Sequence, residues 1–120
     1  DLGLKKLVDL GEWFMTETNL PLPLGGNAIR RDLGDEMINK LSDILKRSIQ
    51  FSLDNRKDAL AYAMTFAPDI PEDLADRFVG MYVNELTVDQ GKRGEAAICK
   101  LFEMANERGL YTKPVVPEFV

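Results

Sequence analysis

The chain has 120 residues, enough for one domain or a large part of one. Hydrophobic residues make up 45% of it and charged residues 29%, which is typical of a globular protein and excludes a disordered one. The net charge of -5 argues against nucleic acid as a partner, because phosphate backbones bind clustered Lys and Arg. No run of 18 apolar residues occurs, so we predict no membrane-spanning segment and no membrane partner.

The sequence contains no histidine and a single cysteine, Cys99. Because His is the commonest general acid or base near neutral pH, Ser–His and Cys–His nucleophilic catalysis are excluded within these residues. A zinc site would need acidic residues and Cys99 alone, so we predict no metal site. One cysteine permits no intrachain disulfide and indicates a reducing, cytoplasmic location. Cys99 lies between Ile98 and Leu101 on a predicted helix, where we expect a buried, unreactive thiol.

The first 32 residues predict mixed α/β structure, beginning with a short strand over residues 4–8. Asp9, with Glu12 three positions further on, resembles the N-cap of a helix that extends from Leu10 to about Thr18. Asn19 can adopt the left-handed conformation that ends a helix. The chain begins at Asp with no initiator Met, so we expect that it has been cut from a longer protein whose strands complete the sheet.

Two alternating prolines within residues 20–24 exclude a helix and favour an extended segment, followed by a strand over about residues 24–30. Gly25 and Gly26 would then form a bulge or allow a small molecule to approach the backbone, and Asn27 offers both a donor and an acceptor. These three residues are the candidate substrate-binding site. The simpler interpretation, a strand bulge followed by a capping Asn, is favoured by the pattern alone.

From residue 33 onward the three- and four-residue spacing of apolar residues predicts only helices. The four predicted helices cover about residues 34–53, 56–67, 71–84 and 88–108. Their large apolar side chains, together with those of the first helix, are expected to face a core: Leu10, Trp13, Phe14, Leu60, Met64, Leu74, Phe78, Met81, Tyr82 and Phe102.

Individual residues predict where these helices begin and end. Asn55 is expected to cap the second helix, and Pro71 suits the first turn of the third. Thr87 and Gln90 fit a capping box for the fourth, and Gly109 is a natural residue to follow its last turn.

Charged residues provide no catalytic pair. Arg30 and Arg31 could bind a carboxylate, but Asp32 beside them favours a surface role. The acidic residues gather at predicted helix starts, where the helix dipole favours them, and no two are spaced like a glycosidase pair.

Two stretches resemble the 1,4-dihydroxy-6-naphthoate synthase family, whose enzymes act in the futalosine route to menaquinone. They are Val-Asp-Leu-Gly-Glu-Trp at residues 8–13 and Leu-Pro-Leu-Pro-Leu-Gly-Gly-Asn-Ala-Ile-Arg-Arg-Asp-Leu at residues 20–33. A third stretch, Val-Asn-Glu-Leu-Thr-Val-Asp at residues 83–89 with Gly91 and Gly94, is similar to the last-helix region of the family. Chorismate dehydratases share the opening and the Leu-Pro motif but lack the Leu-Gly-Gly-Asn-x-Ile-Arg-Arg continuation.

The resemblance implies an α/β, two-lobed fold like that of type 2 periplasmic binding proteins, of which this chain is the helix-rich C-terminal part. Residues 1–32 would end the second lobe, and residues 33–120 would pack toward the first lobe and the hinge. It implies a cytoplasmic carbon–carbon lyase that releases 1,4-dihydroxy-6-naphthoate from cyclic dehypoxanthine futalosine without a metal or redox cofactor. The general base would be a histidine upstream of Asp1, so this chain would hold no catalytic residue and be inactive alone.

Other functions remain open at this point. A small-molecule (solute) binding protein of the same fold would bind its ligand without chemistry, and a chorismate dehydratase would act on a different substrate. A helical interaction module would need no site at all. In the enzyme interpretation the partner is a small-molecule substrate, and a homodimer is left open.

Overall fold

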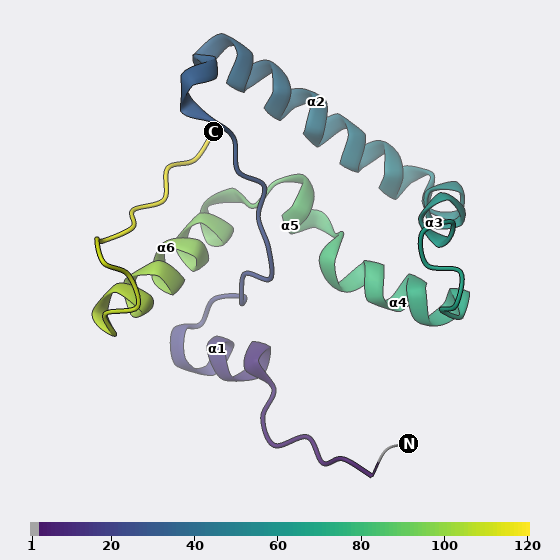
Figure 1. Ribbon diagram of the computed structural model, residues 1–120, viewed down its shortest axis with the longest axis horizontal. Coiled ribbons are helices and arrows are strands. Elements are labelled where there is room, and N and C mark those ends of the chain that lie inside the picture. Colours follow the sequence, from purple (N-terminus) through teal and green to yellow (C-terminus); the bar gives the residue numbers. More distant parts are fainter. Residues whose placement is uncertain (1–2) are drawn as a thin grey trace. The chain divides into compact units, whose positions relative to one another are not determined.

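The computed structural model describes residues 3–120, and in this part of the chain all regular structure is helical (Figure 1). The chain forms two compact units. The first contains the chain up to Leu24 together with Gly91–Phe119, and the second contains Gly25–Gln90 together with Val120.

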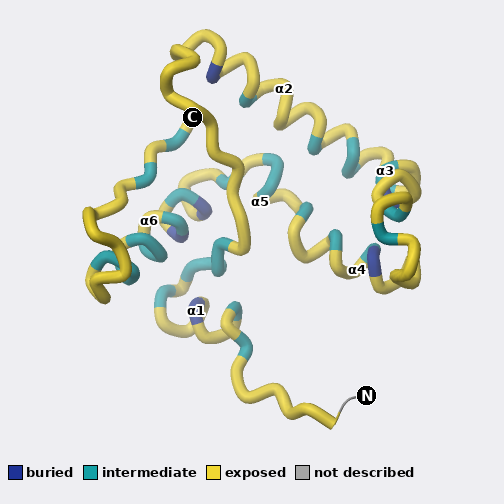
Figure 2. Tube along the Cα trace, viewed as in Figure 1, coloured by how far each residue is buried: buried dark blue, intermediate teal, exposed yellow. Residues whose placement is uncertain are grey.

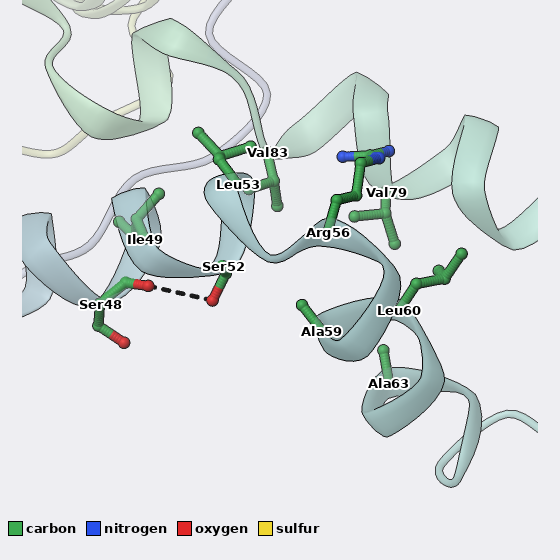
Figure 3. A pocket seen from close by; sticks show the side chains of 10 residues that line it. All are labelled: Ser48, Ile49, Ser52, Leu53, Arg56, Ala59, Leu60, Ala63, Val79 and Val83. Carbon is green, nitrogen blue, oxygen red and sulfur yellow. Dashed lines mark hydrogen bonds between the residues drawn. The ribbon is translucent and has the colours of Figure 1, made fainter.

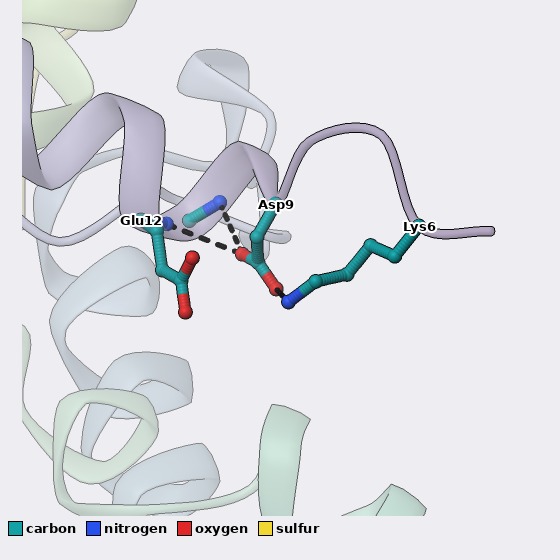
Figure 4. Close-up of polar contacts among 4 residues, drawn as sticks. Lys6, Asp9 and Glu12 are labelled. Atoms are coloured by element: carbon teal, nitrogen blue, oxygen red, sulfur yellow. Dashed lines mark hydrogen bonds and ion pairs between the residues drawn. The ribbon is translucent and has the colours of Figure 1, made fainter.

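The first unit begins with α1, Leu10–Thr18, whose two ends are fixed by the residues that the sequence indicated. Asp9 Oδ1 accepts hydrogen bonds from the backbone N–H groups of Gly11 (3.0 Å) and Glu12 (3.2 Å), and Asp9 Oδ2 lies 3.4 Å from Lys6 Nζ (Figure 4). Asn19 has a left-handed backbone, with φ 58°, and its N–H donates to the Met15 carbonyl. The predicted helix and both of its caps are confirmed.

The second helix of this unit is α6, Gly91–Glu107, which ends in a Schellman motif. Gly109 has φ +66°, its N–H donates to the Asn106 carbonyl at 2.9 Å, and the N–H of Leu110 donates to the Ala105 carbonyl at 3.1 Å. Arg93 joins α6 to α1, since its Nη2 donates to the Asn19 carbonyl at 3.4 Å.

The C-terminal tail is held against α6. The Asn106 side chain donates to the Val115 carbonyl (3.1 Å) and accepts from the Val115 N–H (3.2 Å). The amide therefore satisfies both backbone polar groups of Val115. The rings of Phe102 and Tyr111 stack with their centroids 5.9 Å apart.

The second unit begins with a 3-10 turn, η1, Arg31–Leu33, which leads into the long helix α2, Asp35–Asp54. Helices α3 (Arg56–Met64), α4 (Glu72–Tyr82) and α5 (Glu85–Val88) follow. Helix α2 packs against η1, α3 and α5, and α3 packs against α4.

The two predicted strands are wrong for the described part of the chain. Residues 4–8 and 24–30 form no ladder, and Arg30 is extended (φ -72°, ψ 132°) without a strand partner. The prolines in residues 20–24 explain why the chain is extended there, since they exclude a helix. A strand also needs a neighbour to accept its hydrogen bonds, and residues 3–120 supply none.

Helix ends in the second unit differ from the prediction in three ways. Asn55 lies at the N-cap position of α3, but its side chain donates backward to the Phe51 carbonyl at 2.9 Å, so it caps the end of α2 and makes no capping hydrogen bond to α3. Pro71 is the N-cap of α4 rather than a residue of its first turn. The predicted fourth helix, about residues 88–108, is α6, but the prediction missed the short helix α5 before it, so five α-helices rather than four follow residue 32 among the described residues.

The missed helix, α5, begins at a capping box that was predicted three residues later in the chain. Asn84 and Thr87 form the capping box: Asn84 Oδ1 accepts from the Leu86 N–H at 3.0 Å, and Thr87 Oγ1 accepts from the Asn84 N–H at 3.1 Å. Thr87 was predicted to begin this box, with Gln90 as its partner. It is the closing residue instead, and α6 begins only at Gly91, which has φ +54°.

Few side chains in residues 3–120 are buried (Figure 2). The buried hydrophobic residues are Phe14, Ile38, Leu60, Ala75 and Ala97. Phe14 has an exposed fraction of 0% and is the largest fully buried side chain among the described residues. Most of the side chains predicted to face a core are exposed or partly exposed, including Leu10, Trp13, Leu74, Phe78, Met81 and Tyr82.

Cys99 is also exposed, which contradicts the predicted buried thiol. Helix α6 turns Gly94 and Ala97 inward, and a residue two positions after Ala97 lies about 200° further around the helix. The apolar neighbours of Cys99 in the sequence therefore say little about its own burial.

Candidate functional site

Gly25, Gly26 and Asn27 lie in the extended segment between α1 and η1, and all three are exposed. A Cβ atom built on either glycine would meet no other atom within 4 Å, and neither glycine has a positive φ. Neither close packing nor a left-handed backbone therefore requires glycine here. The backbone of this segment is open to a ligand.

Arg30 and Asp32, immediately after this segment, form an exposed ion pair. Arg30 Nε donates to Asp32 Oδ1 at 2.9 Å. This hydrogen bond from Arg30 lowers the pKa of the Asp32 carboxyl and raises the pKa of the Arg30 guanidinium. Because Arg30 already holds a carboxylate of its own chain, the structure supports the surface role that the sequence favoured.

The second unit contains a pocket of about 220 Å³ where the end of α2 meets α3 and α4 (Figure 3). Its lining is mainly aliphatic, and the Ser52 hydroxyl beside it donates to the Ser48 carbonyl at 3.0 Å. The residues that line it are Ser48, Ile49, Ser52, Leu53, Arg56, Ala59, Leu60, Ala63, Val79 and Val83.

Arg56 is the charged residue of this pocket, and it is committed to α4. Its Nε donates to Asp76 Oδ1 at 2.7 Å, and its Nη2 donates to the Asp76 carbonyl at 2.8 Å. A Cβ atom on Gly80 would lie 3.3 Å from Arg56 Nη2, so the lack of a side chain there makes room for the guanidinium. Arg56 therefore joins α3 to α4 and is not a free anion-binding group.

Sequence reasoning missed this pair and a second one, Lys46 Nζ to Asp89 Oδ2 at 2.7 Å, which links α2 to the end of α5. The members of the pairs are 20 and 43 residues apart in the chain. Each charged residue looks like ordinary helix surface in the sequence, and only the packing of the helices brings the partners together.

Where the pKa of a titratable group in residues 3–120 is shifted, the cause is a helix cap or an ion pair. No group of three or more Cys, Asp and Glu side chains in that range could hold a metal ion. Asp9 has a lowered pKa because its carboxylate accepts the Glu12 backbone N–H, which is a helix-capping role. None of the helices in the described part of the chain is both long and apolar enough to cross a membrane.

Comparison with known proteins shows the class to which this helical arrangement belongs. The family model for menaquinone biosynthesis matches residues 1–107, and the chain therefore belongs to that family.

Two curated relatives are both named 1,4-dihydroxy-6-naphtoate synthase. The protein from Thermus thermophilus is 39% identical over 118 residues, which are 98% of this chain and 43% of the relative. The protein from Streptomyces coelicolor is 39% identical over 108 residues, which are 90% of this chain and 38% of the relative. The chain thus spans less than half the length of these relatives.

A crystal structure is similar to this chain. Protein AF1704 from Archaeoglobus fulgidus matches with a TM-score of 0.83 and 41% sequence identity, over 91% of this chain and 41% of that protein. The resemblance found in the residue patterns is thus confirmed at the level of the family.

Proposed function

We propose that this chain forms the helical part of a 1,4-dihydroxy-6-naphthoate synthase. In this proposal the whole enzyme is a carbon–carbon lyase that converts cyclic dehypoxanthine futalosine to 1,4-dihydroxy-6-naphthoate during menaquinone biosynthesis. The observation that carries the proposal is the 39% identity to the Thermus thermophilus synthase over 98% of the chain. No observation favours a solute-binding protein, a chorismate dehydratase or a helical interaction module over it.

The proton-transfer chemistry is assigned to a different part of the family's polypeptide. A lyase of this kind needs a group that removes or delivers a proton near neutral pH, and these 120 residues contain no histidine. Three of the described carboxylates, those of Asp9, Asp32 and Asp76, instead pair with Lys6, Arg30 and Arg56. The proposed general base is a histidine outside the matched region, and the 120-residue chain alone is expected to be inactive.

Gly25, Gly26 and Asn27 are the proposed contribution of this chain to substrate binding. Support comes from the open space around both glycines and from the exposed amide of Asn27, which can donate to and accept from substrate hydroxyls. Substrate contact would also explain two glycines in succession where the backbone itself requires none.

The proposed fold of the whole enzyme has two lobes, like that of type 2 periplasmic binding proteins. Residues 1–32 would end the second lobe, and residues 33–120 would be a rigid scaffold toward the first lobe and the hinge. Such a scaffold suits a cleft that closes on its ligand. The proposal also locates the enzyme in the cytoplasm, since a single cysteine indicates a reducing compartment.

The decisive experiment uses a chimera in which this chain replaces the matched region of the Thermus thermophilus synthase. We expect the chimera to release naphthoate from cyclic dehypoxanthine futalosine, detected by mass spectrometry, and the 120-residue chain alone to release none. A chimera that folds but gives no naphthoate would refute the enzyme assignment.

A matched pair of variants in the same chimera tests the glycine segment. Gly26→Val should lower kcat/KM about tenfold or more, because a branched side chain would stand between the backbone and the substrate. Ala61→Val, which adds a branched side chain at an exposed position of α3 outside the segment, is the control and should leave kcat/KM unchanged. Equal activity of the two variants would remove Gly26 from the proposed site.

A further inference from the structure

The second unit has an apolar face between α3 and α4 that nothing in the described chain covers. A groove of about 450 Å³ runs along it and is lined almost entirely by hydrophobic side chains, including Leu60, Ile70, Leu74 and Phe78. Leu74 is 51% exposed and Phe78 is 59% exposed, although both sit in the apolar stripe of α4. A contiguous exposed apolar surface marks a site that binds another protein, a membrane or a ligand.

The total exposed surface indicates how large the covering polypeptide should be. The chain exposes 10027 Å², whereas a folded monomer of 13.5 kDa exposes about 6,500 Å². Even two separate domains of half this mass would together expose only about 7,900 Å². The surplus is therefore roughly 2,000 Å² at least, whichever comparison is used.

A standard protein–protein interface is too small to cover that surplus, since it removes about 800 Å² from each partner. A second copy of the chain would have to form a large obligate interface, which removes about 1,000–2,500 Å² from each partner. The relatives supply an occupant of suitable size, because more than half of their length lies outside the region that this chain matches.

We propose that the α3–α4 groove packs against the part of the family's polypeptide that lies outside the matched region, and that Leu74 and Phe78 are its central anchors. This inference rests on the proposed membership of a larger synthase. The occupant presents apolar side chains to the groove. The interface is therefore mainly apolar, like the core of a domain, and contains few charged residues.

The test compares one substitution in two settings, the 120-residue chain and the Thermus thermophilus chimera described above. In the chain Phe78 is 59% exposed and loses only a ring contact with Tyr82, with centroids 5.1 Å apart, so Phe78→Ser should lower the melting temperature only slightly and leave the circular dichroism nearly unchanged. In the chimera the groove is covered, so the same substitution should lower the melting temperature by about 5 °C or more. Leu74→Ser should repeat the pattern as a second, independent variant.

The matched control is Arg77→Ser, at the neighbouring exposed position of α4, which does not line the groove. It should leave both proteins unchanged. Equal responses of chain and chimera to Phe78→Ser would overturn the proposal. Light scattering that shows a dimer of the 120-residue chain, dissociated by Phe78→Ser, would overturn it in favour of a second copy.

These measurements are independent of turnover. If the chimera shows the differential loss of stability but makes no naphthoate, the docking surface stands and the assigned reaction falls. If it makes naphthoate while Phe78→Ser acts equally in both settings, the reaction stands and the docking surface falls.

Discussion

The two units of the molecule illustrate two kinds of interaction, local hydrogen bonds and the packing of apolar faces. In the first unit, hydrogen bonds close the helix ends and hold the tail: Asp9 caps α1, Asn106 binds the tail, and the backbone at Gly109 ends α6. In the second unit, α3 and α4 leave their apolar residues facing water. Local hydrogen bonds thus need only neighbours in the sequence, whereas an apolar face needs a partner surface.

The largest expected effect tests the packing of the first unit. Phe14→Ala should destabilise it by about 3 kcal/mol or more, because Phe14 is fully buried and its loss leaves a cavity. The control is Trp13→Ala in the same helix, where 42% of the side chain is already exposed and the cost should be clearly smaller. Urea unfolding measures both, and equal costs would show that α1 packs differently.

A comparison of two glycines tests whether the backbone conformation requires glycine at each position. Gly109→Ala should cost about 1 kcal/mol, because φ +66° is unfavourable for a residue with a Cβ atom. Gly26→Ala should change the free energy of unfolding by less than about 0.5 kcal/mol, since it lacks a positive φ and its Cβ would meet open space. Thermal unfolding of the two variants gives the comparison, and a reversed order would contradict the assigned backbone roles.

The link between α3 and α4 should have a smaller effect. Arg56→Gln removes the ion pair with Asp76 and should destabilise the second unit by about 0.5 kcal/mol, because both side chains are more than a third exposed and water screens their attraction. Lys57→Gln, at the next residue of α3, is the control. High salt should reduce the difference between Arg56→Gln and the unsubstituted chain, and a difference that persists would indicate packing rather than charge.

The smallest effect concerns pH. The Glu12 N–H bonded to Asp9 lowers the pKa of that carboxyl below its ordinary value of 3.8 in the folded state. A carboxyl with a depressed folded pKa stabilises the fold above its unfolded pKa, and this stabilisation is lost as the pH falls through the folded value. The helix signal of α1 should therefore weaken below about pH 4. In Asp9→Asn, which keeps a capping oxygen without a titrating charge, this acid-dependent loss should disappear.

The sequence predictions were most accurate for interactions between residues that are close together in the chain. Asp9, Asn19 and Gly109 act within a few residues of themselves, and the sequence placed each of them correctly. The capping box was predicted at Thr87 and Gln90 instead of Asn84 and Thr87, because Thr87 can be the first residue of one box or the last residue of another. Only the three-dimensional arrangement decides between such overlapping signals.

Strand pairing and the partner of an apolar helix face could not be predicted from local sequence patterns. The strand over residues 24–30 was wrong because extended backbone becomes a strand only beside another strand. Apolar spacing gave the helices of the second unit, but it could not state what lies against Leu74 and Phe78. The candidate site at Gly25, Gly26 and Asn27 rests on residue type and exposure, and it stays a prediction.

The exposed position of Cys99 has a practical consequence. It is the only thiol in the chain and lies on the outer side of α6, so a maleimide dye would attach at one defined position. A dye there sits on the helix that carries Phe102 and Asn106, the two residues that hold the C-terminal tail. The fluorescence anisotropy of the dye should therefore change when Asn106→Ala releases the tail. Neither the label nor this substitution alters a residue of α3 or α4.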